Sequence, residues 1–533
     1  MRNKYLMPII VAVCLAVGVR MGFHIAKSNN VASYNGNSDN LSCINDVFSL
    51  INEEYVDTIN MKDLQVKAVT HVLESMDPHS EYIKPEILND VNDNLHGSFE
   101  GIGVSFRIEK DTITIINTIK GGPSEKVGIL AGDRIVYVGD TLVAGTKVTN
   151  KDAMRLLKGP KKSKVDVKIK RHGINDLLDF TIIRDVIPTY SVDVAYMIND
   201  NIGFIKLTKF SQTTHKEFVN AVKNLKAEGM TKLILDLRDN TGGYLGEAVG
   251  VADEMLADNN LIVYTEGKHR DRSYIFSRHR GLWENNDVVV LINEGSASAS
   301  EIVAGALQDN DRGTIIGRRS FGKGLVQEQF DLGDNGAIRL TLARYYTPTG
   351  RCIQKPFEGS KEEYLLEEYS RYATGEMFSV DSIHFADSLK YVTPGGKIVY
   401  GGGGIMPDIY VPLKNDSTHY FFNKMANNSV LFQYAFDYSD MHRNEILKYG
   451  DAMAFGDKFV FTDAMFEELM RRTEEKKIKG TEADKIKARE LSEPLFKAYV
   501  ARNVFGDEAF YPLYEPMDEI LQEAIGVLES KMD

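Results

Sequence analysis

Two short segments of this chain carry residue types that could together activate a serine. Ser296, Ser298 and Ser300 alternate with alanines just before an apolar, helix-like run, and Lys323 follows 25 residues after Ser298 between two glycines. A serine hydroxyl becomes a nucleophile when a base accepts its proton, and a lysine can be that base when its charge is suppressed. The pair therefore favours a peptidase that works through a serine and a lysine.

Lys323 has to be neutral to accept the serine proton, so its pKa must fall from about 10.4 to near 7. Burial in an apolar pocket lowers a lysine pKa because desolvation disfavours the ammonium. Gln327 lies four residues further on, in a segment of strand-like composition. Its neutral amide oxygen could orient the amine, whereas a carboxylate would hold the lysine protonated. We therefore expect Gln327 to be the orienting residue and Glu328 to point elsewhere.

The serine segment is expected to form a sharp turn between a strand and a helix. The strand ends near Asn293 and the helix begins at about Ser298. The start of a helix offers unpaired N–H groups, and the Ala299 amide would be the first donor for an oxyanion. The turn of Gly242 and Gly243 could supply a second donor, because a backbone without Cβ lets a substrate approach closely.

The segment from 190 to 413 has the alternating pattern of an α/β core. We expect strands at 202–207, 232–237, 287–292 and 314–317, and helices at 214–228 and 298–308. Near-continuous apolar strands separated by amphipathic helices indicate a largely buried sheet, with the active loops at the strand ends.

The segment from 97 to 172 resembles a PDZ domain. It opens with Gly101, Ile102, Gly103 and Val104, and it continues with alternating strands and a capped helix from about residue 150. A glycine-rich turn can present successive N–H groups to a carboxylate, and the next strand can pair with an extended peptide. We therefore expect these four residues to bind the free C-terminus of a protein or peptide substrate.

The two ends of the chain differ from this core. Residues 1–26 hold Arg2 and Lys4 before an apolar run of about 15 residues, which suits a secretory signal better than a membrane span. The sequence leaves open a cleaved signal or an uncleaved anchor that contacts the membrane. Residues 27–40 have the composition of a linker, and 41–93 and 417–533 have helical patterns. The predicted fold class is an α/β multidomain protein with a helical N-terminal region, a PDZ β-barrel-like domain, a peptidase core and a helical C-terminal region.

Composition excludes several classes of function. The 533 residues imply two to four domains, and the net charge of −13 argues against nucleic acid as a partner. Three cysteines are too few for a disulfide framework. The chain has no H-E-x-x-H motif and no G-x-S-x-G motif, and none of its 11 histidines lies near the serine or lysine segments in sequence. We therefore expect no metal, no cofactor and no Ser-His-Asp triad.

Five motifs make the chain similar to the C-terminal processing (tail-specific) serine peptidases. They are 77–80, 236–243, 295–301, 321–327 and 402–408, in that order, and the resemblance covers roughly residues 42–413. It implies that Ser298 is the nucleophile, Lys323 the base and Gln327 its partner. It also implies that Ala299 and Gly243 form the oxyanion region and that the PDZ domain binds substrate tails and gates the active site. In relatives, helical tails support dimerisation, so the resemblance leaves a homodimer open.

We therefore expect a serine endopeptidase that cleaves exported proteins by an acyl-enzyme route. The N-terminal segment indicates export to a bacterial periplasm, with anchoring in the inner membrane left open. The alternative is a catalytically idle PDZ scaffold that only binds peptide tails. The intact Ser298, Lys323 and Gln327 argue against that alternative, because an idle relative has no chemical need for all three.

Overall fold

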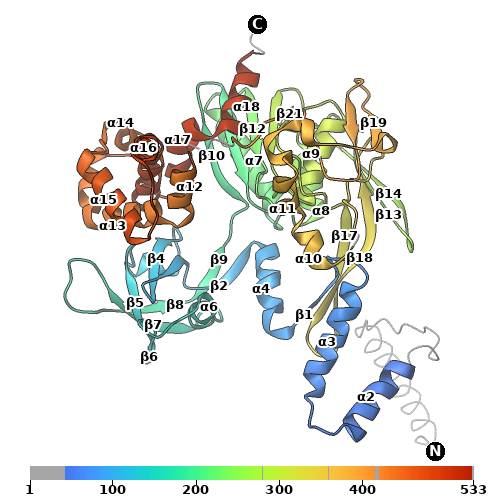
Figure 1. Ribbon diagram of the computed structural model, residues 1–533, viewed down its shortest axis with the longest axis horizontal. Helices are drawn as coiled ribbons and strands as arrows, with labels where there is room; N and C mark the ends of the chain where they lie inside the picture. Colours follow the sequence, from blue (N-terminus) through green and yellow to red (C-terminus); the bar gives the residue numbers. More distant parts are fainter. Residues whose placement is uncertain (1–41, 279, 358, 415–418, 531–533) are drawn as a thin grey trace, which may run out of the picture. The chain divides into compact units, whose positions relative to one another are not determined.

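The computed structural model describes residues 42–278, 280–357, 359–414 and 419–530 (Figure 1). The chain divides into two compact units, residues 1–72 and 73–533. The expected leader, 1–26, and the expected linker, 27–40, lie outside the described residues. Among the residues that are described, no helix has both the length and the apolar composition that crossing a bilayer requires.

The first unit contributes helix α2 (Ser42–Glu54) and most of helix α3 (Met61–Glu74). Both helices follow the helical period expected for residues 41–93. On α2, however, the apolar side chains of Ile44, Val47 and Leu50 are exposed. The sequence pattern therefore predicted that these segments are helical, but it did not predict which of their apolar side chains are buried.

A small β-domain follows strand β1 (Glu81–Ile83) and helix α4 (Pro85–His96). Its elements are β2 (Ser98–Gly101), β3 (Val104–Glu109), β4 (Thr112–Thr118), α5 (Pro123–Lys126), β5 (Arg134–Val138), β6 (Thr141–Leu142), α6 (Asn150–Leu157), β7 (Lys164–Lys170), β8 (Leu178–Ile183) and β9 (Asp185–Pro188). The main sheet has the order β3-β4-β5-β7-β8, with β6 paired to β5, and β2 pairs separately with β9. Strand β3 is thus an edge strand.

Local sequence explains this domain well. On β7, Val165, Val167 and Ile169 are buried while Asp166 and Lys168 between them are exposed, which is the alternation of a half-buried strand. Helix α6 begins with a capping box in which Thr149 and Asp152 exchange hydrogen bonds. The sheet continues past residue 172 through β8, where Ile182 is fully buried.

The second unit is built around a six-stranded sheet. Its strands are β10 (Val192–Met197), β11 (Ile202–Leu207), β12 (Lys232–Asp236), β15 (Asp287–Ile292), β16 (Thr314–Gly317) and β21 (Ile409–Tyr410). They have the order β10-β11-β12-β15-β16-β21, and every pair except β10 with β11 is parallel. Strand β15 is apolar along its length because both of its faces are buried.

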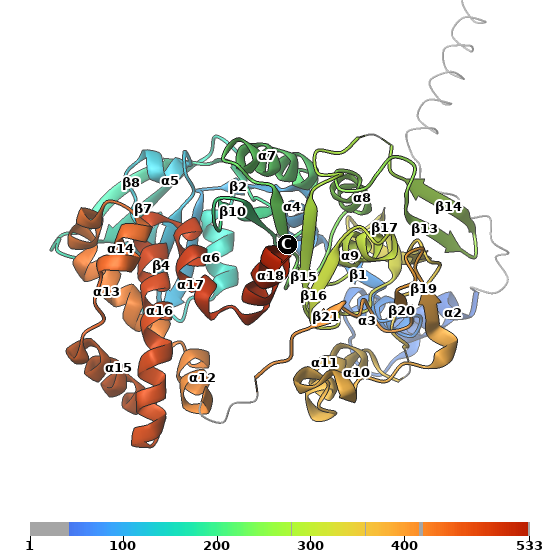
Figure 2. The ribbon, with the colours of Figure 1, turned by 90° about the horizontal axis from the view of Figure 1, so that it is seen from above.

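Helices cover both faces of this sheet (Figure 2). The helices α7 (Thr214–Ala227), α8 (Leu245–Asp253) and α9 (Ala299–Asp309) share one core with the sheet. Helix α18 (Glu519–Ser530) closes the other face, where Leu521 and Leu528 pack with Phe204 and Leu291. The last helix of the described chain is therefore part of the core of this unit.

A second, antiparallel sheet lies beside the first. Its strands are β1, β13 (Leu261–Gly267), β14 (Arg270–Phe276), β17 (Leu325–Asp331) and β18 (Ala337–Tyr346). They have the order β1-β18-β13-β14, and β17 also pairs with β18. Helices α10 (Lys361–Leu365) and α11 (Glu367–Ala373) and the hairpin of β19 (Lys390–Val392) and β20 (Ile398–Tyr400) follow before β21. Lys323 stands directly before β17, and Gln327 lies within that strand.

The C-terminal helices form a core of their own. They are α12 (Tyr420–Asn427), α13 (Val430–Ile446), α14 (Ala452–Lys458), α15 (Asp463–Glu475), α16 (Glu482–Phe505) and α17 (Phe510–Tyr514), and aromatic side chains dominate their packing. This region contacts the β-domain through an ion pair of Arg134 with Asp440 and through Arg107, whose guanidinium lies 4.2 Å from the Phe432 ring centroid. These elements confirm the predicted fold class, an α/β multidomain protein with a helical C-terminal region.

Candidate active site

The three serines of the serine segment have different surroundings. Ser296 and Ser300 are fully buried, and their hydroxyls donate to the Leu237 and Asn240 carbonyls, each at 2.8 Å. Both side chains therefore serve as local hydrogen-bonding groups. Ser298 instead lines a pocket with a volume of about 730 Å³.

The backbone at Ser298 is strained. Strand β15 ends at Ile292 and helix α9 begins at Ala299, and between them Ser298 has φ +55° and ψ −112°. A residue with a side chain rarely adopts positive φ, and such outliers gather at active sites where the surrounding structure holds them. The turn therefore presents Ser298 at the N-terminus of α9, as the sequence predicted.

Two glycines allow the facing loop to approach Ser298. Gly242 and Gly243 have φ +101° and +148°. A Cβ on Gly242 would lie 2.8 Å from the Cβ of Ser298, and a Cβ on Gly243 would lie 2.1 Å from the Phe210 carbonyl oxygen. Gly243 and Ala299 line the same pocket as Ser298, and in the described chain neither amide donates to a protein group. Both are thus available to an oxyanion.

The Lys323 side chain is held by a neutral partner. Its Nζ donates to Gln327 Oε1 at 2.9 Å. Burial lowers the pKa of Lys323, the Arg339 guanidinium lowers it further, and the carboxylates of Glu81, Glu301 and Asp77 oppose the shift. A lowered pKa is what a lysine base requires.

Gln327 is fixed by two further features. Its Nε2 donates to the His79 carbonyl at 2.7 Å, so its oxygen must face Lys323. A β-bulge between Val326 and Gln327 interrupts the pairing of β17 with β18, and a bulge re-aims the side chains beside it. As a result Leu325, Val326 and Gln327 all line the pocket.

The loop that holds Gln327 is ordered by Asp77. Its carboxylate accepts hydrogen bonds from the amides of His79 and Ser80, both at 2.8 Å, and from the Ser80 hydroxyl at 2.6 Å. Burial alone would raise the pKa of Asp77, but these hydrogen bonds lower it. The turn at 77–80 thus has a role at the site that its sequence pattern did not reveal.

A buried carboxylate joins the serine and lysine segments. Glu301 accepts hydrogen bonds from the amides of Ser298 (2.8 Å), Gly322 (2.7 Å) and Lys323 (2.8 Å) and from the Ser320 hydroxyl (2.5 Å). Burial raises the pKa of Glu301, and the four donors counteract that rise by stabilising its charged form.

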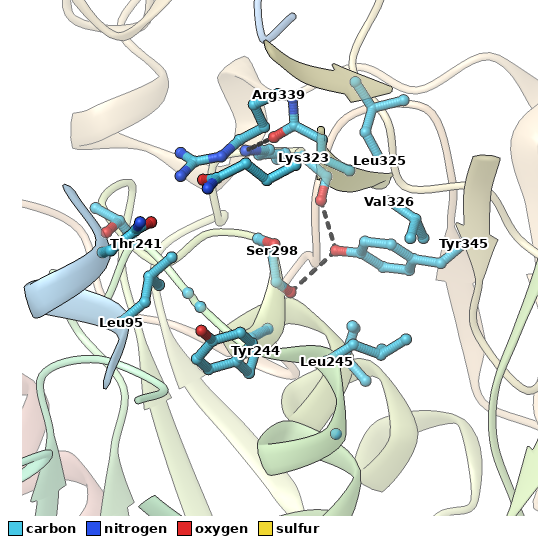
Figure 3. Close-up of a pocket in the computed structure, with 18 of the residues that line it drawn as sticks. Leu95, Thr241, Tyr244, Leu245, Ser298, Lys323, Leu325, Val326, Arg339 and Tyr345 are labelled. Carbon is cyan, nitrogen blue, oxygen red and sulfur yellow. Dashed lines mark hydrogen bonds between the residues drawn. The ribbon is translucent and has the colours of Figure 1, made fainter. Parts of the chain in front are cut away.

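Tyr345 makes a second connection between the two segments. Its hydroxyl lies 3.0 Å from the Ser298 carbonyl oxygen and 2.5 Å from the Lys323 carbonyl oxygen (Figure 3). Burial raises the pKa of Tyr345 well above its ordinary value, so the hydroxyl keeps its proton for these carbonyls.

The pocket brings together the five core residues that the sequence singled out: Ser298, Ala299, Gly243, Lys323 and Gln327. Figure 3 shows Ser298 and Lys323 facing the same space from different elements. Within the described residues, no hydrogen bond joins the Ser298 hydroxyl to the Lys323 amine. Catalytic hydrogen bonds often tighten only when substrate is bound.

Two histidines that are distant from the serine and lysine segments in sequence lie close to the site in the folded chain. His96, at the end of α4, lines the pocket, and His79 lies beside the Gln327 amide. The His79 ring, however, contacts Tyr364 Oη at 3.0 Å, and burial with the nearby Lys323 charge lowers the pKa of His79 to about 4. Sequence separation says little about distance across a folded core, so neither histidine could be placed near the site from the sequence.

Gly101, Ile102, Gly103 and Val104 lie in the β-domain, apart from this pocket. Gly103 has φ +73°, and the Ile102 carbonyl accepts from the Ser124 hydroxyl at 2.7 Å. In the part of the chain that the structure describes, the amides of Ile102 and Gly103 donate to no protein group. The turn therefore presents free N–H groups at the start of edge strand β3.

Sequence reasoning missed several residues of the site. Glu301 could have been found, because Ser298 and Glu301 have the S-x-x-E spacing of a capping box. Tyr345 and Arg339 lie on a strand with no local signal of function. Asp236 and Arg238 order the turn before the two glycines, since Arg238 donates to Asp236 from its backbone and its side chain.

Comparison with known proteins assigns the main parts of the chain to families. Residues 201–361 match the model of Peptidase family S41, and residues 101–182 match that of the PDZ domain. Residues 421–506 match a family of unknown function, DUF8443.

Relatives that match over more than half of this chain carry related names. A carboxy-terminal-processing protease of Bartonella bacilliformis is 39% identical over 319 residues, which cover 59% of this chain and 72% of that protein. The carboxy-terminal processing protease CtpA of Bacillus subtilis is 32% identical over 329 residues, covering 62% of this chain and 70% of that protein. A solved structure of a photosystem II D1 C-terminal processing protease covers 69% of this chain and 87% of its own, at 26% identity and a TM-score of 0.35.

Proposed function

This chain belongs to the carboxy-terminal processing proteases, which are serine-type peptidases, and we propose that it cleaves peptide bonds with a dyad of Ser298 and Lys323. The observation that carries the proposal is the buried Lys323 amine, held 2.9 Å from the neutral Gln327 Oε1 in the pocket that Ser298 lines. A lysine with a neutral partner and a lowered pKa suits proton transfer from a serine.

The reaction follows from these positions. Neutral Lys323 takes the Ser298 proton as the serine oxygen bonds to the scissile carbonyl carbon, and the Ala299 and Gly243 amides hold the oxyanion. The lysine then gives that proton to the leaving amine, and an acyl-serine remains. Water, deprotonated by Lys323, attacks the ester carbon and releases the acid, and the proton returns to Ser298.

The dyad is tested with Ser298→Ala and Lys323→Ala. Each is expected to lower kcat on a fluorogenic peptide by at least roughly 10³-fold, because neither partner replaces the other. Ser273→Ala, on the exposed strand β14, is the matched control. Retained turnover in Ser298→Ala would contradict the dyad, and a wild-type protein that binds peptides without ever cleaving them would be the idle scaffold.

We further propose that the β-domain binds the free C-terminus of the substrate. The free amides of Ile102 and Gly103 beside edge strand β3 support this, because they suit a carboxylate and a paired peptide strand. Wild-type protein is expected to bind free-acid peptides more tightly than their amides, as measured by fluorescence polarisation.

A glycine pair gives a control for the tail-binding proposal. Gly103→Ala should weaken the free-acid preference, since its Cβ would crowd Ile187 and Pro123 at 3.1 and 3.2 Å. Gly121→Ala meets no atom within 4 Å at a similar φ of +71°, so it reports strain alone. Equal binding of acid and amide by wild-type protein would contradict tail binding.

For location, we propose export to a bacterial periplasm directed by residues 1–26. The basic residues before a short apolar run support this. Cell fractionation with N-terminal sequencing of the mature protein would separate a cleaved signal from an inner-membrane anchor. Cytoplasmic protein with an intact N-terminus would contradict export, and sedimentation of the same sample would test for a homodimer.

A further inference from the structure

The side chains that line the active-site pocket differ in kind from the acidic chain as a whole. Three basic side chains line it, His96, Lys323 and Arg339, and none of the described residues that line it is an aspartate or a glutamate. The chain as a whole has a net charge of −13. With Lys323 neutral, the Arg339 guanidinium still brings a permanent positive charge to the pocket, and that charge favours anionic groups on whatever enters it.

Arg339 contributes an unused hydrogen-bond donor to this pocket. It lies on β18, opposite Glu81 of β1 and Gln329 of β17. Its Nη1 donates to Glu81 Oε1 at 3.1 Å, while its Nη2 is buried and has no partner among the described residues. A buried donor without an acceptor is costly, so such a group in a native site points to a missing ligand atom.

The position of Arg339 is suited to a substrate contact. Figure 3 shows its guanidinium beside Lys323 on one wall of the pocket, across from Leu95 and Tyr244. The planar fork of a guanidinium matches the two oxygens of a carboxylate better than any other anion-binding side chain. Only one of the two terminal nitrogens is engaged by Glu81, whose side chain is 45% exposed and can move aside.

We propose that Arg339 forms a carboxylate subsite in the active-site pocket, which binds an acidic group of the substrate peptide close to the scissile bond. The carboxylate can come from an aspartate or glutamate side chain or from the terminus of the peptide itself. The proposal rests on the proposed peptidase function of this pocket and adds a preference to it.

The experiment scans one glutamate through a fluorogenic, C-terminally amidated peptide, with the glutamine peptide as partner at each position. The ratio of kcat/KM for glutamate over glutamine is measured in wild-type protein and in Arg339→Gln. At one position near the scissile bond the wild-type ratio is expected to be on the order of tenfold, as for one charge-assisted hydrogen bond. Arg339→Gln should bring this glutamate-to-glutamine ratio near one. Arg344→Gln, which changes an exposed arginine on the same strand, should leave the ratio as in wild-type protein.

A second variant separates binding from a structural role. Glu81→Gln removes the carboxylate that competes for Arg339, so it should increase the glutamate preference. If Arg339 merely ties β1 to β18, Arg339→Gln and Glu81→Gln would have equal effects on thermal stability and neither would change the ratio. A free-acid advantage of the glutamine peptide that Arg339→Gln abolishes would place the peptide terminus at Arg339.

Ratios of one at every position in wild-type protein, or equal ratios in wild-type and Arg339→Gln, would overturn the subsite. Such a result leaves the dyad standing as long as cleavage still depends on Ser298. Cleavage that persists in Ser298→Ala would instead contradict the proposed function itself.

Discussion

At the scale of single residues, Glu301 shows how the site is aligned. Its carboxylate accepts the amides of Ser298 and Lys323 at once, so the two dyad residues share one anchor. Backbone N–H groups need an acceptor when they are buried, and here a single side chain provides it for both segments. The hydrogen bonds of the Glu301 carboxylate go to the backbone of both dyad residues and not to the reacting hydroxyl or amine, so Glu301 is a positioning residue.

Glu301→Gln tests this role. The glutamine side chain would turn its NH₂ group toward N–H and O–H donors that now point at the Glu301 carboxylate. The dyad residues would then be misplaced, so we expect kcat to fall roughly 10- to 100-fold while KM changes less. Steady-state kinetics and a thermal melt on the same sample give both readouts. Glu328→Gln, which breaks an exposed pair with Arg270, is the control. An unchanged kcat would show that the backbone turn holds its position without this carboxylate.

The charges around Lys323 predict the pH dependence of cleavage. Lysine must be neutral to act, so activity is lost as the pH falls through its pKa. Arg339 lowers that pKa and Glu81 raises it. Arg339→Gln should therefore move the acid limb of kcat to higher pH, and Glu81→Gln should move it to lower pH.

The pH–rate profiles of these two variants, with Arg344→Gln as control, check the prediction. Glu301, Asp77 and His79 also face Lys323, and all three residues are left unchanged in these variants. Shifts in the same direction, or none, would mean that the acid limb reports another group.

Ser298, Lys323 and the orienting Gln327 were singled out from the sequence, but the residues that contact their backbone or side chains from other elements were not. Gln327 stood out because it lies four residues beyond Lys323 and carries no charge. His79 and Tyr345 did not, because they act at 248 and 22 residues of separation through contacts that exist only in the folded chain.

At the scale of elements, the loop after β12 determines how close the backbone can come to Ser298. Gly242 has φ +101°, and a Cβ there would lie within 3 Å of Ser298 Cβ and of the Ala297 oxygen and Ala299 nitrogen. The loop and the N-terminus of α9 therefore fit together only because this position has no side chain.

Gly242→Ala is expected to lower kcat by roughly 10²- to 10³-fold, the loss typical of one oxyanion donor. The methyl group would push the loop, and with it the Gly243 amide, away from Ser298. Kinetics on the fluorogenic peptide measure the effect. Gly526→Ala, which adds a methyl in open space on α18, is the control. Wild-type rates in Gly242→Ala would remove this loop from the oxyanion site.

The alternation of apolar strands and helices was enough to predict the sheet and the loops at its strand ends. The β-bulge before Gln327 was not predictable, since neither Val326 nor Gln327 has a composition that marks a bulge. Its effect on the pocket depends on the pairing partner β18, which lies further along the chain.

At the scale of the whole molecule, helix α18 packs against the six-stranded sheet, and the residue before it contacts the loop that faces Ser298. Arg238, at the start of the glycine loop, donates to both carboxylate oxygens of Asp518 at 2.7 Å. It also donates to Asp236, which is fully buried; the charges of Arg238 and Lys206 outweigh that burial and lower the pKa of Asp236 to about 2. Asp518, the residue before α18, is thus joined through Arg238 to the loop that faces Ser298.

Asp518→Asn should reduce the free energy of unfolding by roughly 1–3 kcal/mol, the cost of weakening a mostly buried charged hydrogen bond. It should also lower kcat, because Arg238 loses part of its anchor. Urea unfolding and kinetics measure the two effects. Glu519→Gln, in an exposed pair with Lys414, should change stability by less than about 0.5 kcal/mol. If Asp518→Asn and Glu519→Gln had equal effects on the free energy of unfolding and on kcat, Asp518 would not support the loop.

The helical pattern of the C-terminal residues predicted that α18 buries one face, but not which surface it would bury it against. Leucines such as Leu521 and Leu528 can pack against any apolar surface. Only the folded structure shows that they pack against the sheet, at Phe204 and Leu291. For the same reason the sequence left the role of this region open.

The ion pair between Arg238 and Asp518 also sets an order in time. The two residues are 280 positions apart, and chains are synthesised at about 5–20 residues per second, so the glycine loop waits roughly 15–55 seconds on the ribosome for its support. For the last part of that interval, after residue 323, a nascent chain already contains Ser298 and Lys323 but lacks the helix that fixes the loop opposite them. The glycine loop therefore gains its last support only after both residues of the proposed dyad have been synthesised.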